Sequence, residues 1–143
     1  MKHSSRAATW SASWLALSLM STAAFAQAGK VDMGKQEFDA SCAVCHGSSG
    51  TGNGPFLPYL RSSPPDLTTL AKRNGGVFPV NQVFETIEGG NVPGHNARDM
   101  PIWGSTYRMQ AGEHYVDMPY DPAVYVRSRV LALVEYINRL QVK

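Results

Sequence analysis

The chain has 143 residues, of which 43% are hydrophobic and 17% are charged, and this size and composition fit one globular domain. Lys2 and Arg6 account for the whole formal net charge of +2, so residues 27–143 are neutral. A neutral domain has no general basic field, which excludes nucleic acid and anionic membrane surfaces as expected partners.

Residues 1–26 have the pattern of a secretory signal peptide. Basic residues open the segment, an apolar run follows, and Ala24-Phe25-Ala26 supplies the small-x-small pattern at which such leaders are cleaved. A membrane anchor is the alternative, but the apolar run falls short of the ~20 residues that span a bilayer. We therefore expect cleavage after Ala26, export to the periplasm, and a mature form without a membrane span.

The first helix is predicted over residues 30–43. Asp32 is suited to cap it, and Gly34, Phe38 and Cys42 recur every four residues on one face. Residues 47–58 contain four glycines and two prolines and are predicted to form a loop.

Between these segments lies the stretch Cys-Ala-Val-Cys-His, which contains both cysteines of the chain. A thioredoxin-like redox pair needs a βαβ setting and a zinc site needs four ligands, and the sequence offers neither. Covalent haem attachment fits, because cysteines three positions apart on a helix share one face and the adjacent histidine can turn its imidazole under the iron. We therefore predict one covalently bound haem c, with Cys42 and Cys45 as thioether residues and His46 as an iron ligand.

The rest of the chain is also predicted to be helical or irregular. Short helices are expected over residues 67–73 and 79–88, and residues 90–120 are expected to be irregular. The last helix begins at Asp121 and Pro122 and carries an apolar stripe formed by Val126, Val130, Leu133, Ile137 and Leu140. Since short helices alone make a poor core, the predicted fold class is all-α around a buried cofactor.

Over roughly residues 30–141 these features resemble class I c-type cytochromes, which are small monohaem electron carriers. The resemblance implies that the first and last helices cross through Gly34, Phe38 and Tyr136. It also implies that a proline carbonyl accepts a hydrogen bond from the imidazole of the haem ligand. Pro58 has the usual spacing for this role, and Pro55 is the alternative.

In this family the sixth iron ligand is a methionine, commonly followed by proline, in a loop before the last helix. Met100 and Met118 both stand in an Asp-Met-Pro tripeptide, whereas Met109 does not. Met118 has the more usual distance from the last helix, but a glycine-ended helix precedes Met100 and Ile-Trp-Gly follows its proline. We therefore choose Met100 as the ligand and keep Met118 as the alternative.

Further expectations accompany this choice. Trp103 covers the edge of the haem, and residues 104–120 are a loop insertion in a cytochrome c domain that spans residues 27–143. His95 and His114 are alternative ligands that would give a bis-histidine haem. Met33 is expected to serve packing or to lie on the surface.

The resemblance implies one-electron transfer between redox proteins, from a dehydrogenase or cytochrome donor to an oxidase or reductase acceptor. No enzymatic activity is expected of the chain itself, because both axial positions of the iron are filled. A dedicated subunit of a periplasmic dehydrogenase is the alternative, since Tyr107, Tyr115 and Tyr120 with Arg108 resemble the composition of an interface. The protein is accordingly expected to be a monomer or a subunit of such a complex.

Overall fold

The structure is a computed structural model that describes residues 30–90 and 100–142. The chain divides into two units, residues 1–31 and 32–143, and nearly all described residues belong to the second. The predicted signal peptide and His95 lie outside the described residues.

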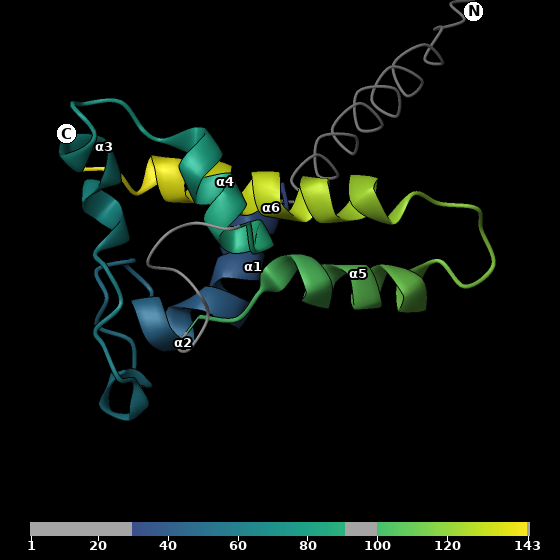
Figure 1. Cartoon of the computed structure of the whole chain (residues 1–143), viewed down its shortest axis with the longest axis horizontal. Helices are drawn as coiled ribbons and strands as arrows, with labels where there is room; N and C mark the ends of the chain where they lie inside the picture. Colours follow the sequence, from purple (N-terminus) through teal and green to yellow (C-terminus); the bar gives the residue numbers. More distant parts are fainter. Residues whose placement is uncertain (1–29, 91–99, 143) are drawn as a thin grey trace, which may run out of the picture. The chain divides into compact units, whose positions relative to one another are not determined.

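The described residues form helices and no strand, which confirms the all-α fold class (Figure 1). The helices are α1 (Met33–Glu37), the π-helical turn η1 (Phe38–Cys42), α2 (Ala43–His46), the 3-10 turns η2 (Leu57–Tyr59) and η3 (Leu67–Thr69), α3 (Leu70–Arg73), α4 (Val80–Glu88), α5 (Trp103–His114) and α6 (Pro122–Arg139).

The first helix runs without interruption from α1 through η1 into α2. Its cap is the predicted one, because the Asp32 side chain accepts a hydrogen bond from the Lys35 N–H at 3.0 Å. The predicted range, residues 30–43, was shifted by three residues. The helix begins at Met33 and ends at His46, so it includes Cys45 and His46 as well as Cys42. Within η1 the Ala43 N–H bonds to the Phe38 carbonyl, one residue further back than in an α-helix.

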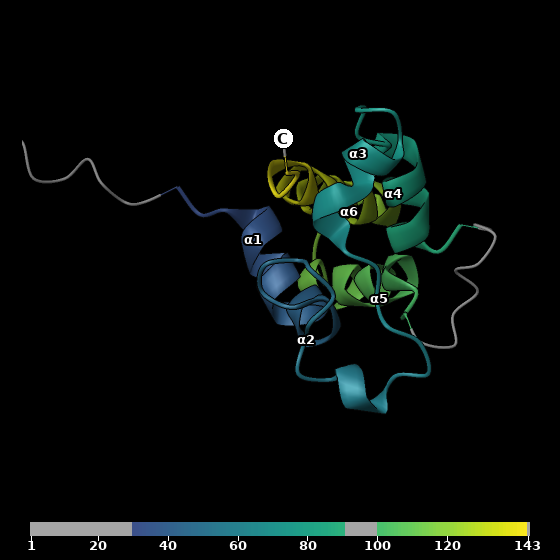
Figure 2. The same ribbon diagram turned by 90° about the vertical axis from the view of Figure 1, so that its left-hand side faces the viewer.

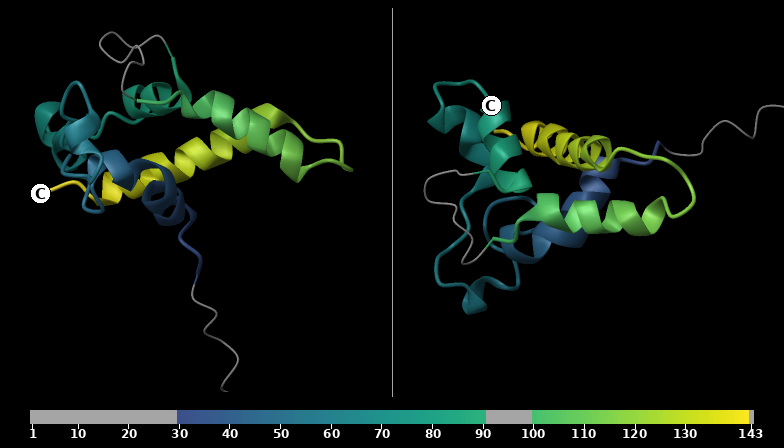
Figure 3. Two further views of the ribbon diagram at one scale, coloured as in Figure 1. Left: turned by 90° about the horizontal axis from the view of Figure 1, so that it is seen from below. Right: turned by 45° about the vertical axis from the view of Figure 1, so that its right-hand side comes forward.

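Helices α1 and α6 cross (Figure 3, left), and their closest approach involves Gly34. A Cβ at Gly34 would lie 2.1 Å from the carbonyl oxygen of Ala132 and 2.9 Å from the Cβ of Tyr136. Glycine therefore allows a backbone approach that a larger residue would prevent. One turn later, Phe38 packs on Tyr136, which confirms the predicted contact between the terminal helices.

Helix α6 forms the centre of the core, and α1, α4 and α5 all pack against it (Figure 2). Its predicted stripe is buried from Val126 to Ile137, and Leu140 is half-buried. The Asp121 side chain caps its first turn by accepting a hydrogen bond from the Ala123 N–H at 2.8 Å.

The prediction of irregular chain over residues 90–120 was wrong for α5. This helix lies beside α6 and runs antiparallel to it (Figures 1 and 3, right). Trp103, Tyr107 and Ala111 are spaced by four residues and face the core, where Tyr107 and Ala111 are buried. The pattern is easily missed because the apolar face is one residue wide and Gly104 and Gly112 interrupt it.

Candidate haem-binding site

Cys42, Cys45 and His46 lie together at the junction of η1 and α2. Both thiols are free and half-buried, and the imidazole is buried with 8% of its surface exposed. No group of three or more His, Cys, Asp or Glu side chains within residues 30–90 and 100–142 has the arrangement of a metal site. Two reduced thiols and a buried imidazole on one helical segment are the groups that covalent haem attachment uses.

The glycine loop after α2 folds back onto the attachment motif. Three of its N–H groups donate to the last carbonyls of the helix, and these bonds are Gly52 to His46 at 2.8 Å, Gly54 to Cys45 at 3.1 Å and Phe56 to Val44 at 2.9 Å. Helix carbonyls at a C-terminus otherwise lack partners. A Cβ at Gly54 would lie 2.5 Å from the carbonyl oxygens of Val44 and Cys45. The glycines thus let the loop approach the backbone of the motif and fix its shape.

His46 is held as a neutral ring. Burial lowers its pKa, and the backbone of Pro65 partly offsets this effect. Its Nδ1 atom is buried and has no hydrogen-bond partner among the described residues. A neutral imidazole is the form that binds a metal ion, so the ring suits an iron ligand.

The backbone carbonyl that bears on the His46 ring is that of Pro65, whereas Pro58 lies exposed in the turn η2. Gly52 accounts for this placement, because a Cβ there would lie 2.5 Å from the Pro64 carbonyl oxygen. The loop that bonds to His46 therefore brings the adjacent prolines against the same residue. Sequence spacing favours Pro58, and the adjacent pair Pro64-Pro65 is a further candidate that the spacing does not single out.

The first thiol lies in an environment that disfavours its charge. Burial raises the pKa of Cys42 to about 12, with smaller contributions from Glu37 and Cys45. The neutral thiol is the poorer nucleophile. Cys42 without its cofactor is therefore an unreactive side chain at neutral pH, and not an activated redox cysteine.

Four methionines are described, and they differ in burial. Met100 is half-buried and packs against the core. Met33, Met109 and Met118 are exposed, Met109 by 66% and Met118 by 65%. A half-buried thioether next to the core can take part in a closed cofactor site, whereas an exposed one would first have to move.

The segment from Met100 to Trp103 is anchored where α5 meets the end of α4. A Cβ at Gly104 would lie 2.3 Å from the Glu88 carbonyl oxygen, and one at Gly89 would lie 2.2 Å from the Ile102 side chain. Trp103 is half-buried, packs against the core and lies 6.2 Å from Tyr107 between ring centroids. Contacts on both sides thus hold Met100 and Trp103 in place.

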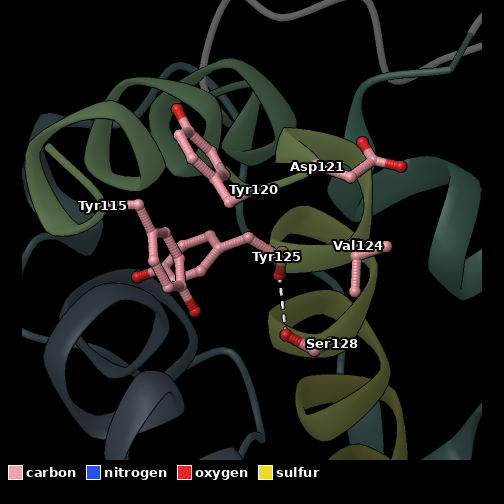
Figure 4. A pocket seen from close by; sticks show the side chains of 6 residues that line it. All are labelled: Tyr115, Tyr120, Asp121, Val124, Tyr125 and Ser128. Atoms are coloured by element: carbon pink, nitrogen blue, oxygen red, sulfur yellow. Dashed lines mark hydrogen bonds between the residues drawn. The ribbon is translucent and has the colours of Figure 1, made fainter. Parts of the chain in front are cut away.

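Met118 and His114 lie elsewhere, near the link between α5 and α6. A hollow of about 240 Å³ opens there, lined by Tyr115, Tyr120, Asp121, Val124, Tyr125 and Ser128 (Figure 4). His114 is exposed and meets Tyr115 edge to face at 4.8 Å. The end of α5 and the beginning of α6 lie far from α2 (Figure 1). The structure does not bring either residue to the attachment motif.

Two thiols, a neutral histidine and an all-α fold define a c-type haem protein. The chain belongs to the cytochrome c family, because the family model described as Cytochrome c matches residues 31–141. The search of curated proteins and the search of solved structures found no match.

Family membership establishes the general function. The chain has a covalently attached haem c, it transfers electrons, and its partners are redox proteins. Across residues 30–90 and 100–142, no helix combines the length and hydrophobicity that crossing a bilayer requires.

Proposed function

We propose that the chain is an exported monohaem electron carrier of the periplasm, in which Cys42 and Cys45 hold the porphyrin while His46 and Met100 hold the iron. The observation that supports the sixth ligand is burial, since Met100 packs against the core and the other described methionines are exposed. The leader at residues 1–26 supports export.

When bound, the haem supplies a ferric/ferrous couple, and a thioether ligand favours the ferrous state relative to a second histidine. The residues of the chain orient and protect this couple. His46 offers an uncharged imidazole, and the Pro65 carbonyl is the acceptor that would orient it. As the second protein ligand, Met100 would leave no position on the iron for a substrate. We therefore propose no enzymatic activity for the chain alone.

Absorption spectra of the purified mature protein in both oxidation states test this proposal. A ferric protein with sulfur ligation shows a weak near-infrared charge-transfer band, and a covalently attached haem stays with the chain after acid–acetone extraction. A spectrum without the near-infrared band would refute ligation by Met100. Mass spectrometry of the same sample tests the leader, because cleavage after Ala26 leaves Gln27 as the first residue.

The second candidate is a dedicated subunit of a periplasmic dehydrogenase. The link between α5 and α6 favours it, because Val116, Met118 and Val124 are exposed by 77%, 65% and 62% beside the stacked rings of Tyr115 and Tyr120. A free carrier would elute at its monomer mass and meet its partners in small, transient encounters. A dedicated subunit would co-purify with a larger polypeptide.

A further inference from the structure

Three helices meet at a charged cluster that packing alone does not explain. Tyr107 is 1% exposed, and its hydroxyl donates a hydrogen bond to Oε2 of Glu37 at 3.1 Å. The other carboxylate oxygen, Oε1, accepts a hydrogen bond from Nη1 of Arg129. The Glu37 side chain is 16% exposed and the Arg129 side chain is 27% exposed. The cluster therefore holds a charge pair in a region that water screens poorly.

The π-helical turn brings this cluster toward the haem-attachment motif. Glu37 immediately precedes η1 and Cys42 ends it. In an α-helix residues five positions apart point to different sides, whereas the wider π-turn, with its i→i+5 bond, brings them closer to the same side. Glu37 accordingly contributes to the raised pKa of Cys42, and Cys42 contributes to the raised pKa of Tyr107. Cys42 also packs against the core cluster that contains Tyr107, whose hydroxyl bonds to Glu37, so the carboxylate, the thiol and the phenol lie in one region of the domain.

We propose that Glu37, Tyr107 and Arg129 form an electrostatic element that sets the reduction potential of the haem from the side of Cys42. The inference rests on the proposed function, since it requires a haem bound at Cys42. These three residues would influence the haem through their charges and hydrogen bonds, without contacting the iron.

The physical basis is the sign of each charge. The ferric state carries one more positive charge than the ferrous state, so a nearby carboxylate stabilises it and a nearby guanidinium destabilises it. In the wild type the two charges oppose each other, and the Tyr107 hydroxyl offsets part of the carboxylate charge. Removing one of these charges leaves the effect of the other on the reduction potential unopposed.

Spectroelectrochemical titration of the mature holoprotein at pH 8 and low salt tests the proposal. Glu37→Gln should raise the midpoint potential, and Arg129→Gln should lower it. The double variant should return close to the wild-type value, because it removes both charges. Matched controls come from α6, where Glu135 and Arg139 form an exposed ion pair. Glu135→Gln and Arg139→Gln should leave the potential nearly unchanged, since solvent screens that pair.

Opposite shifts are essential, because a structural role predicts a different result. If the cluster only clamps the three helices together, each substitution loosens the fold and admits water to the haem, so that both variants shift the same way. Shifts of like sign, or no shift in either variant, would therefore overturn the proposal. A protein without a reversible haem couple would refute the proposed function as well, and this result differs from a normal couple with like-signed shifts.

A third variant covers the case in which a single charge removal prevents folding. Tyr107→Phe keeps the buried ring and both charges but removes the donor to Glu37. It should lower the potential in the same direction as Arg129→Gln and by less. An unchanged or raised potential in Tyr107→Phe would overturn the proposal.

Discussion

The rings of Phe38 and Tyr136 lie with their centroids 5.1 Å apart and their planes inclined by 50°. Phe38 is fully buried in this contact and Tyr136 nearly so. The contact joins the beginning of the domain to its end, and Phe38 lies on the same continuous helix as Cys42, Cys45 and His46. Its loss should therefore affect the stability of the whole domain.

Phe38→Ala should lower the free energy of unfolding by about 3–5 kcal/mol, because it empties a large buried site. Phe56→Ala is a matched control, since Phe56 also lies 5.1 Å from a tyrosine ring, that of Tyr59, but is 46% exposed. This control should cost roughly 0.5–1.5 kcal/mol. Denaturant unfolding measures both, and a wild-type midpoint for Phe38→Ala would refute the contact.

Two glycine substitutions should change stability in opposite directions. Gly34→Ala forces a Cβ against the Ala132 carbonyl and should destabilise the domain by about 1–3 kcal/mol or more. Gly112 lies in α5, and the nearest atom to a Cβ there is the Tyr120 hydroxyl oxygen at 3.7 Å. Gly112→Ala should stabilise by up to about 1 kcal/mol through helix propensity. Thermal unfolding that shows the same sign for both would contradict the close crossing.

The covalent attachment should depend on both cysteines. After denaturing gel electrophoresis, a haem peroxidase stain should colour the wild type at its monomer mass, because thioether bonds survive denaturation. Cys42→Ala with Cys45→Ala should give no stain, and each single variant should give a haem held by one bond with a shifted visible band. Stain retained in the double variant would show that another residue holds the porphyrin.

Met100 and Met118 offer a direct test of the sixth ligand. Met100→Ala should abolish the near-infrared band, lower the potential and open the iron to cyanide or carbon monoxide. Met118 is exposed, so Met118→Ala should keep the band and cost about 0.5 kcal/mol or less. The reverse result would assign the ligand to Met118. A band kept in both variants would point to Met109, and a wild type without it would point to His95 or His114.

Tyr107 should make stability depend on alkaline pH. Burial, followed by the charge of Glu37, raises its pKa above the ordinary value of 10.0. Because this pKa is higher in the folded than in the unfolded state, the neutral phenol stabilises the fold fully below pH 10. The stabilisation is lost as the pH rises through the folded-state pKa of Tyr107. The free energy of unfolding of the wild type should therefore exceed that of Tyr107→Phe by roughly 1.5–3 kcal/mol near neutral pH, as expected for loss of a hydrogen bond to a charged group. Urea unfolding should show this difference shrinking above pH 10, and a constant difference would contradict the assignment.

The sequence predicted the parts of the fold that strong local signals specify. The apolar stripe of α6 and the caps at Asp32 and Asp121 depend on residue types at regular spacing, whereas the crossing through Gly34 followed from the family resemblance. The proposed attachment residues were recognised for a related reason, since their motif is contiguous in the sequence. Such features need no knowledge of distant contacts.

Other features depend on tertiary contacts and could not be predicted this way. The helix α5 has a narrow apolar face, and its burial against α6 stabilises what propensity alone would not. The π-turn over Phe38–Cys42 lies in a segment whose i, i+4 pattern is that of an ordinary α-helix, so the pattern gave no sign of it. The Pro65 carbonyl lies at His46 because the glycine loop folds back, and counting residues along the chain does not reveal such a contact.

The hydrogen bonds between the glycine loop and α2 have a consequence for biogenesis. They join residues only a few positions apart, so that forming them requires little loop-closure entropy, whereas the crossing of α1 and α6 must wait for the end of the chain. A fragment that stops after Thr68 retains every bond that shapes the motif. On the proposed export route, the emerging chain can therefore present two correctly spaced thiols and the adjacent histidine to the attachment machinery before its last helix has been translocated.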